Sequence, residues 1–546
     1  MRAAWGALLL AACTGQIALP TGAPADNTPP STNDTSGNGY PAFAPTTSYQ
    51  LRRLTTEQYV ASVQTLLGVS AQGMPPIEPV APVAGYTSIG AATTVVSSDG
   101  VAQFEATANF LAAAAMASST ARAQLLPCTP SGVSDTTCFT QFAGTFGQHA
   151  FRRPLTTDEV TAYAALTAQV AMTTGDPLLG IQSTVSAFLQ SPNFLYLPEL
   201  GEPDPALPGR LRYTDYEMAS RLSFFLTNQT PDDQLLAAAG NGELTTVAGV
   251  DTQVDRLLSS PGAHDAMKNF FTAMLSLDGL DGLARSPAAF PQFTPTLSGA
   301  LKQQTLLTFD DLIFSRDADY HSVFTDQSTF VNAELAAFYG LTPPTSGGFV
   351  RLMLPSGPRV GLLGQAGVLL VHDHSEATSP TKRGLFVLTK LLCQPLALAP
   401  PAGLTIPPPP TGKMTARQRL TQHATAGCSS CHTPMDSVGL SLEHFDALGV
   451  WRDQDQSMAI DDSGQIGGVS YQGEAGLASL VASHRATDPC LVQALYGASV
   501  GHVPSEFDRD SFKSLVTNFD AGGSKIKPLL KAITESDGFR YAPAPN

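Results

Sequence analysis

The sequence has none of the short motifs that mark the common nucleotide-binding and zinc-hydrolase enzymes. Its 546 residues contain no Walker phosphate-binding loop, no His-Glu-x-x-His pair and no Rossmann glycine fingerprint. Long apolar runs are missing too. Beyond the N-terminal segment, the longest run (Val360 to Val371) is broken by glycine and glutamine and is too short to span a bilayer. No transmembrane helix is therefore expected after that segment.

Positive charge is also scarce. The chain has 30 Lys and Arg against 46 Asp and Glu, a formal net charge of −16. A protein that binds nucleic acid neutralises phosphates with Lys and Arg, so this composition argues against nucleic acid as a partner. It likewise gives no attraction to an anionic membrane surface. The negative charge could favour binding of a positively charged partner protein, such as an electron-transfer partner.

The first residues indicate export. Residues 1–12 resemble a lipoprotein signal peptide, with Arg2 as a basic start and an apolar run from Leu8 to Leu10. Leu10-Ala11-Ala12-Cys13 matches a bacterial lipobox, so Cys13 is expected to carry lipid and to anchor the protein to the cell envelope. An ordinary signal peptide with an incidental cysteine is the alternative. Residues 13–48, rich in Pro, Ser, Thr and Gly, are expected to form a disordered tether.

From Tyr49 onward the apolar pattern is mainly helical. Four helix starts combine a capping residue with a downstream apolar stripe. They are Thr55 with Gln58, Thr156 with Glu159, Thr214 before Glu217, and Thr230 with Pro231 at the first helical position. Gly68 is expected to end the first of these helices, and late helices are expected around Leu491 to Tyr496 and Ile526 to Ile533. The expected fold class is mainly α.

The most informative motif is Cys428-Ser429-Ser430-Cys431-His432, because Cys-x-x-Cys-His is the pattern of covalent haem attachment. Two thiols three residues apart lie on one helical turn, where both can bond the vinyl groups of one porphyrin. The adjoining His432 would then be the proximal iron ligand. A zinc site is the first alternative, but no second Cys-x-x-Cys is present to complete four ligands. A dithiol or disulfide without a metal is the second alternative, but the sequence shows no βαβ pattern of the kind that surrounds the dithiol of thioredoxin-like proteins.

The distal iron ligand stays open at this level. Met435 is too close in sequence to His432 to reach the opposite face, so Met458, on a later loop, and the histidines His423, His372 and His374 are the candidates. His372 and His374 could also line the haem or hold a second metal, but two solvated histidines on a polar loop are the favoured explanation. Lys382 and Arg383 could pair with haem propionates or cap a helix end.

The other cysteines can form disulfides in an exported protein. Cys128 and Cys138 flank a polar loop that a local bond could close, and Cys393 and Cys490 could form a long-range clamp. Four reduced, buried thiols are the alternative. Gly497-Ala498-Ser499-Val500-Gly501 formally matches a hydrolase nucleophile elbow, but it follows an expected helix instead of a strand, so no hydrolase is predicted.

Several segments together resemble a multidomain family of unknown function, found in planctomycetes and myxobacteria and built from PSD and PSCyt (planctomycete cytochrome) domains. The segments, in chain order, are Leu51 to Tyr59, Phe151 to Thr156, Ser191 to Tyr196, Ala219 to Leu226, Pro231 to Leu235, Thr378 to Gly384, Cys428 to His432, Met435-Asp436, Gly439-Leu440, Leu442-Glu443, Phe445-Asp446, Gly449 to Arg452 and Asp537 to Arg540. Where the family pattern has asparagine and arginine, this chain has His444 and His502. The resemblance implies a mostly helical, exported protein with a cytochrome-like unit, and it supplies no established reaction.

The expected organisation follows the resemblance. After the tether come three helical PSD-like units at 49–125, 126–205 and 206–345, a PSCyt-like unit with the Cys-x-x-Cys-His site at 346–456, and a C-terminal helical PSD-like unit at 457–546. The predicted function is electron transfer at the cell envelope through one haem c, as a lipoprotein at the outer membrane on its periplasmic or surface face. The alternatives are a haem-dependent oxidoreductase or peroxidase, and a non-haem binding or scaffold protein.

Overall fold

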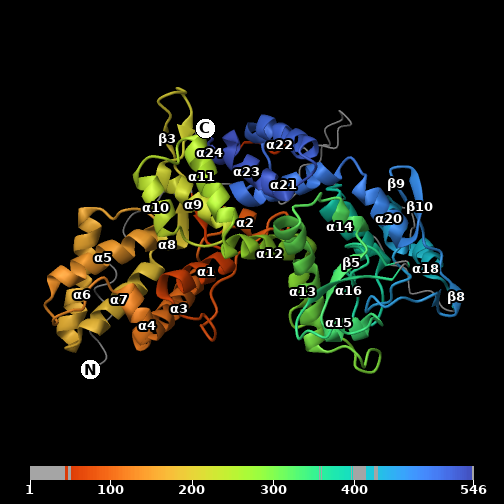
Figure 1. Ribbon diagram of the computed structural model, residues 1–546, viewed down its shortest axis with the longest axis horizontal. Helices are drawn as coiled ribbons and strands as arrows, with labels where there is room; N and C mark the ends of the chain where they lie inside the picture. The colour runs from red at the N-terminus through yellow and green to blue at the C-terminus, as the bar shows by residue number, and fades with distance from the viewer. Residues whose placement is uncertain are drawn as a thin grey trace.

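The computed structural model describes residues 43–46, 51–355, 357, 359–394, 396, 413–423 and 428–543. The signal peptide, Cys13, almost all of the tether and most of the proline-rich strap before the Cys-x-x-Cys-His motif lie outside the described residues. The fold is mainly helical, as predicted, with a few short strands (Figure 1).

Most helices of the first 200 residues form one lobe, at the left of Figure 1. They are α1 (Thr56–Leu67), α3 (Ser98–Ala117), α4 (Ser119–Leu125), α5 (Thr136–Phe151), α6 (Thr157–Thr174), α7 (Pro177–Gln190) and α8 (Pro192–Leu195). The short helix α2 (Thr87–Gly90) lies apart from them and packs into the larger body. The strands β1 (Leu51–Arg53) and β2 (Tyr196–Pro198) pair antiparallel and bring the two ends of the lobe together.

The remaining chain forms a larger body. Its helices are α9 (Asp215–Leu226), α10 (Asp233–Gly240), α11 (Val247–Leu258), α12 (Pro261–Leu275), η2 (Leu277–Leu280), α13 (Pro295–Asp310), η3 (Asp311–Ser315), α14 (Ser322–Thr325), α15 (Ala333–Phe338), α16 (Ala366–Leu370), α17 (Pro380–Phe386), η4 (Val387–Leu391), α18 (Ala416–His423), α19 (Ser429–Leu440), α20 (Gly473–Ala482), α21 (Thr487–Val500), η5 (Glu506–Asp508), α22 (Arg509–Ala521), α23 (Ile526–Glu535) and α24 (Asp537–Arg540).

The strands of this body are short and antiparallel. They are β3 (Glu202–Pro203), β4 (Leu211–Arg212), β5 (Ser328–Val331), β6 (Val350–Met353), β7 (Gln454–Asp455), β8 (Met458–Ala459), β9 (Ser463–Ile466), β10 (Val469–Gln472) and β11 (Tyr541–Ala542). The last of them, β11, pairs with β4, so the end of the chain returns to the start of the larger body.

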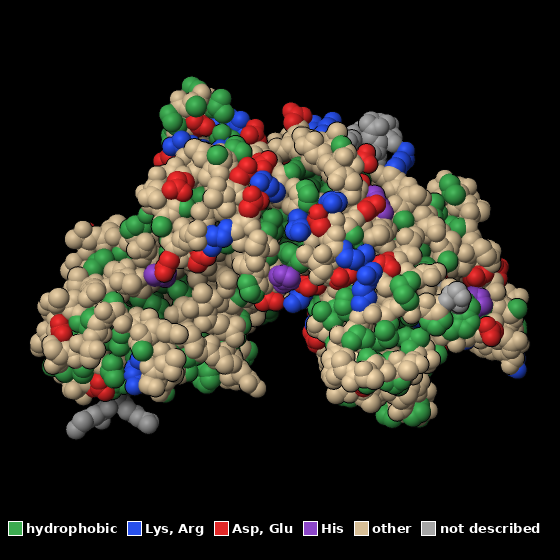
Figure 2. Space-filling model, viewed as in Figure 1, with side chains coloured by type: hydrophobic (Ala, Val, Ile, Leu, Met, Phe, Trp, Pro, Cys, Tyr) green, Lys and Arg blue, Asp and Glu red, His purple; other side chains and the backbone are tan. Residues whose placement is uncertain are grey.

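Two main hydrophobic cores hold the molecule, so the five expected units do not each have a core of their own. One core lies within the first lobe and includes Tyr59, Phe104, Phe146 and Phe188. The second contains Tyr86 and Ile89 at α2 together with residues from α9 to β11, so it joins the third, fourth and fifth expected units and part of the first. On the face drawn in Figure 2, acidic and basic side chains are interspersed over the middle of the molecule, and few lie on the first lobe.

A buried ion cluster joins the lobe to the larger body. Glu199, just after β2, lies 2.9 Å from Arg52 of β1 and 2.7 Å from Arg221 of α9, and all three side chains are almost fully buried. Arg52 also donates to the carbonyl of Ser499 at 3.1 Å, and Arg221 to that of Phe539 at 3.0 Å. Burial lowers the pKa of Arg52. One carboxylate therefore neutralises two guanidiniums where α9, α21 and α24 meet the first lobe.

Three of the four predicted helix starts are confirmed, and one is wrong. Thr55, Thr156 and Thr214 each form a complete capping box, and Gly68 ends α1 in the left-handed conformation at φ 62°. The fourth helix begins at Asp233 instead of Pro231, because Asp232 accepts from Leu235 N and acts as the cap.

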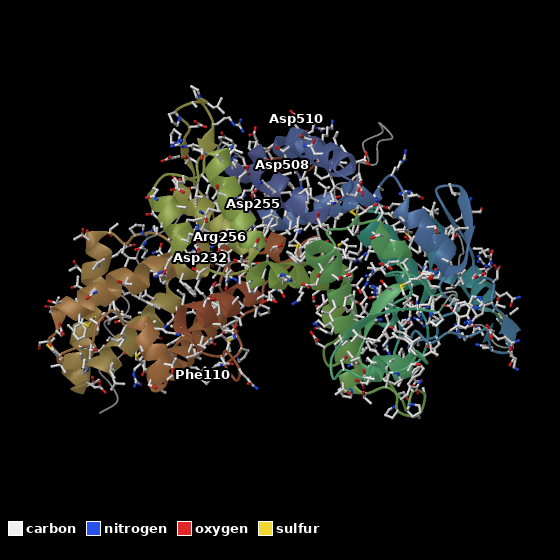
Figure 3. The ribbon with its side chains drawn as sticks, viewed as in Figure 1. Phe110, Asp232, Asp255, Arg256, Asp508 and Asp510 are labelled. Atoms are coloured by element: carbon white, nitrogen blue, oxygen red, sulfur yellow. A yellow bond between two sulfur atoms is a disulfide. The ribbon has the colours of Figure 1, made fainter. Side chains whose placement is uncertain are left out.

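The partners of that fourth helix explain the difference. The Asp232 carboxylate also lies 2.6 Å from Arg256, and Figure 3 shows the two side chains next to each other. The Thr230 hydroxyl instead donates to the carbonyl of His149 at 3.1 Å. The ion pair with Arg256 of α11 thus favours Asp232 over Thr230 as the N-cap of α10.

Two disulfides are present, Cys128–Cys138 and Cys393–Cys490. The first closes the loop before α5, and the second ties the end of η4 to α21. The Gly497-to-Gly501 segment lies at the end of α21, where Ser499 is buried and donates to the Tyr496 carbonyl, so it is not a nucleophile elbow. Within the described part of the chain, no helix combines the length and apolarity needed to cross a membrane.

Candidate functional site

The helix that carries the Cys-x-x-Cys-His motif crosses α17 at very close range. A Cβ added to Gly384 of α17 would lie 1.8 Å from the carbonyl oxygen of Met435, and one added to Gly439 of α19 would lie 1.7 Å from that of Pro380. Neither position can hold a side chain without separating the helices. The family segment around Thr378 to Gly384 is therefore the packing platform of α19.

The motif itself forms the start of α19. Cys428 is the N-cap residue, its carbonyl accepts from the backbone N–H of Cys431 at 3.3 Å and of His432 at 3.0 Å, and both thiols lie on this one turn. Both cysteines are half-buried and neither is in a disulfide. The three side chains that sequence analysis selected are thus placed on one helical turn.

The imidazole of His432 lies near a carboxylate one turn later along α19. His432 Nδ1 lies 3.4 Å from Asp436 Oδ2, and the histidine side chain remains 35% exposed. At this separation the buried Nδ1 has no well-formed hydrogen bond. Thr381 of α17 donates to Asp436 Oδ1 at 2.6 Å and fixes that carboxylate. A carboxylate behind one ring nitrogen is the usual arrangement of a metal-ligating histidine, since it leaves the other nitrogen to bind the metal.

Arg383 has a structural role that the sequence analysis did not anticipate. It is 1% exposed and donates to both oxygens of Asp373, at 3.0 and 2.6 Å. It also donates to three backbone carbonyls of the turn that follows α19, those of Leu442, Phe445 and Asp446. These bonds occupy the guanidinium, so a propionate contact is left to the exposed Lys382 alone.

Glu443 completes the same buried network. It lies 3.8 Å from Arg383, accepts from Thr378 at 3.0 Å and pairs with Arg452 at 2.8 Å. Burial raises the pKa of both Glu443 and Asp373. The buried polar residues Asp373, Arg383 and Glu443 therefore hold α19 against α17.

The remaining sequence candidates are scattered. Met458 is half-buried on β8 opposite Asp455, whose side chain pairs with Arg419 of α18 and Arg452. The His423 side chain lies outside the described residues. His374 is exposed and near Lys382, with Nδ1 3.4 Å from Nζ. Within the described residues, no group of three or more His, Cys, Asp or Glu side chains is arranged to hold a metal ion.

His372 lies on the other side of α17 from the motif. Its ring stacks on Phe386 at 4.3 Å, and Phe386 is two residues beyond Gly384 and so faces away from α19. Its Nε2 is buried without a hydrogen-bond partner. Burial, with the nearby cations Arg383, Lys382 and Lys390, lowers the pKa of His372 to about 3.

Replacing His372 by phenylalanine is expected to make folding less sensitive to acid. The folded-state pKa of about 3 lies below the ordinary value of 6.5, so the unfolded chain takes up a proton first as the pH falls. The stabilising contribution of the neutral ring is complete above pH 6.5 and is lost as the pH falls toward 3. Between pH 7 and pH 4.5 this loss amounts to about 2–3 kcal/mol.

Urea unfolding at the two pH values measures this effect. His372→Phe should lose less stability than wild type on acidification, whereas His374→Gln, at an exposed histidine, should behave as wild type. An unchanged pH slope in His372→Phe would show that His372 is not the acid-sensitive group.

The comparison with family models identifies three domains of this chain. Residues 138–199 match PSD5, a protein of unknown function (DUF1595); residues 213–341 match PSD4, a protein of unknown function (DUF1592); and residues 359–455 match PSCyt3, a protein of unknown function (DUF1588). No curated protein and no solved structure matches the chain. The third match contains α17, α19 and the buried network of Arg383. The chain thus contains three planctomycete-type domains of unknown function, as the sequence resemblance indicated.

Proposed function

We propose that this protein is an exported haem-c protein that transfers electrons at the cell envelope. The observation that carries the proposal is the placement of Cys428, Cys431 and His432 on the first turn of α19, with Asp436 behind His432 Nδ1. The name of the matching domain, PSCyt3, refers to a cytochrome and supports the same assignment. Lipid attachment through Cys13 would hold the protein at the envelope.

The residues present fit such a group. Neither thiol is in a disulfide, and each is half-buried, so each is accessible enough to form a thioether. Asp436, held by Thr381, lies 3.4 Å from His432 Nδ1, which leaves Nε2 as the ring nitrogen that could bind a metal. Lys382 is exposed and could pair with a propionate. A bound haem would supply one-electron chemistry, and its distal ligand would set the potential.

The close crossing of α17 and α19 would also restrict movement around a bound haem. An electron-transfer centre works best when its surroundings move little between oxidation states, and two helices in backbone contact at Gly384 and Gly439 cannot shift independently. The Cys393–Cys490 disulfide further ties the element that follows α17 to the C-terminal helices. The motif therefore lies on a fixed platform.

Removing both thiols is expected to abolish covalent haem. In protein made together with c-type maturation machinery, Cys428→Ala/Cys431→Ala should contain no haem that survives acid-acetone extraction. Each single variant should keep at most one thioether, with a corresponding shift of the pyridine haemochrome α band. Ser430→Ala, between the two thiols, is the matched control and should be coloured like wild type.

The spectrum of the wild-type protein separates electron transfer from enzymatic use of the haem. A low-spin spectrum that cyanide and peroxide leave unchanged supports electron transfer. A high-spin spectrum that responds to either ligand would replace the proposal with an oxidoreductase or peroxidase. A double cysteine variant that retains covalent haem would disprove the attachment site.

A further inference from the structure

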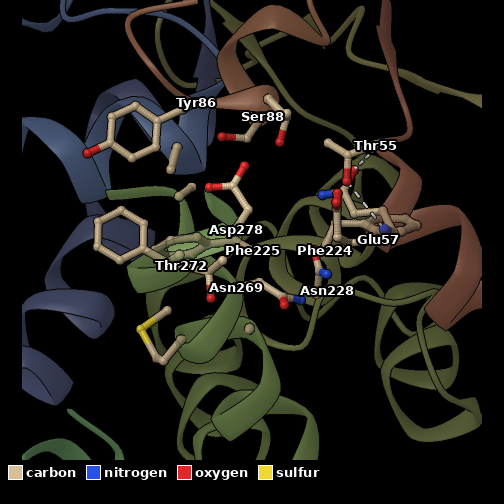
Figure 4. A pocket seen from close by; sticks show the side chains of 17 residues that line it. Thr55, Glu57, Tyr86, Ser88, Phe224, Phe225, Asn228, Asn269, Thr272 and Asp278 are labelled. Atoms are coloured by element: carbon tan, nitrogen blue, oxygen red, sulfur yellow. Dashed lines mark hydrogen bonds between the residues drawn. The ribbon is translucent and has the colours of Figure 1, made fainter. Parts of the chain in front are cut away.

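A cleft of about 190 Å³ lies at the joint between the first lobe and the larger body, far in sequence from the Cys-x-x-Cys-His motif (Figure 4). Its walls come from α1, the short helix α2, the end of α9, α12 and η2, with Ala498 of α21 also part of the lining. Sites for small ligands occur preferentially at such joints between folded units.

Six polar side chains that line this cleft make no hydrogen bond or ion pair with any described residue. Three of them are exposed (Glu57, Asn269 and Asp278) and three are half-buried (Ser88, Asn228 and Thr272). Thr55 and Gln58 also line the cleft, and they bond each other as the capping box of α1. In Figure 4 the Asp278 carboxylate points toward Ser88. Elsewhere in the molecule, comparable side chains at helix ends are used as caps, as Thr156 and Thr214 are. Two carboxylates, two amides and two hydroxyls are thus gathered around one hollow and left unused.

The apolar part of the lining consists largely of aromatic rings. Phe225 is the half-buried ring at the cleft, whereas Tyr86 and Phe270 are each 8% exposed and stack on each other at 5.8 Å in its wall. Aromatic rings bind the C–H faces of cyclic ligands, while hydroxyl, amide and carboxylate groups bind their hydroxyls. Carboxylates accept the stronger, charge-assisted hydrogen bonds.

The negative charge of the lining limits the charge that a ligand can carry. Among the described residues that line the cleft there is no Lys, Arg or His, and Glu57 and Asp278 give it negative charge. An acidic ligand would meet two carboxylates with no counter-ion. A ligand rich in hydroxyls, and neutral or amine-bearing, satisfies both the hydrogen-bonding groups and the charge.

The backbone conformation at Asn228 places its side chain at the cleft. Asn228 has φ 58°, in the left-handed region that asparagine tolerates better than most residues. This conformation follows directly after α9 and lets the amide line the cleft instead of continuing the helix. Glycine adopts the same conformation readily, so Asn228→Gly removes the amide while preserving the backbone.

We propose that this cleft between α1, α12 and η2 is a binding site for a non-acidic saccharide. The ligand would bridge Glu57 of the first lobe and Asn269, Thr272 and Asp278 of the larger body. Because both bodies contribute, binding should also stabilise their association and raise the melting temperature. The site is independent of the haem assignment.

Isothermal titration of the full chain with defined hexasaccharides tests the proposal. The probes are cellohexaose, maltohexaose, N-acetylchitohexaose and the chitosan hexamer, with hexagalacturonic acid as the acidic comparison. At least one of the first four should bind with a Kd of millimolar or better, and the acidic probe should not. Asn228→Gly, Asn269→Ala and Asp278→Ala should each weaken that binding at least tenfold.

The control variant is Asp265→Ala. Asp265 is an exposed carboxylate on α12, the helix of Asn269, and it pairs only with Lys268 at the surface. It should bind the saccharide as wild type does. No binding of any non-acidic probe, binding of the acidic probe alone, or affinity unchanged in all three cleft variants would each overturn the proposal. Melting curves without ligand show whether any variant is misfolded, and Asn228→Gly is the variant least exposed to that risk.

Discussion

Replacing Glu199 by glutamine is expected to lower the free energy of unfolding by about 3–5 kcal/mol, because it leaves two buried guanidiniums without their counter-ion. Glu199 lies within 3 Å of both Arg52 and Arg221, and all three side chains are at most 7% exposed. Glutamine keeps the shape of the side chain and an acceptor oxygen. The loss of unfolding free energy would therefore be due to the missing negative charge. Urea unfolding followed by circular dichroism measures it.

The matched control is Glu202→Gln, three residues along the chain. Glu202 pairs with Arg212 at 2.8 Å, but the two side chains are 44% and 31% exposed. Surface ion pairs contribute about 0–1 kcal/mol, so this variant should be close to wild type. Equal destabilisation by the two replacements would mean that the cluster does not hold the first lobe to the larger body.

Replacing Arg383 by methionine should have a similarly large effect, of about 3–5 kcal/mol or a failure of the domain to fold. The change leaves the buried Asp373 and Glu443 carboxylates without their central cation and three carbonyls without a donor. Arg383→Lys should recover little, because an ammonium cannot bind Asp373 through two parallel bonds. Lys382→Met removes the same charge from the adjacent, exposed residue and should be nearly neutral.

The pH dependence distinguishes this explanation from a simple packing defect. Without Arg383, the folded-state pKa of Asp373 and Glu443 should rise further above their values in the unfolded chain. A raised folded-state pKa favours folding at low pH and disfavours it as the pH rises through that value. The stability gap between Arg383→Met and wild type should therefore narrow from pH 7 to pH 5, and a constant gap would contradict the charge argument.

Local motifs in the sequence predicted local structure well. The capping boxes at Thr55, Thr156 and Thr214 need only a partner three residues away, so their sequence is sufficient to place them. The prediction of Thr230 as an N-cap was wrong because the deciding contact is not local. Thr230 and Asp232 are both good caps, and the deciding partner, Arg256, lies on another helix.

The buried networks could not be predicted from the sequence. From the sequence, Arg383 had two possible roles, pairing with a haem propionate or capping a helix end. Its partners in the structure lie instead on a loop before α17 and on the turn after α19. Nothing in a single sequence connects these segments. Asp436 could have been found, since its i, i+4 spacing from His432 places both side chains on one helical face. The cleft residues come from six elements spread over more than 400 positions, from Thr55 to Ala498, and carry no sequence signal that connects them.

The most direct measurement of the central claim is the intact mass of the purified chain after expression with c-type maturation machinery. The account predicts a red protein whose mass exceeds that of the polypeptide by one haem, with the adduct located by peptide mapping between Cys428 and His432. A colourless protein with the mass of the bare polypeptide, from cells that mature a known cytochrome c in parallel, would contradict it.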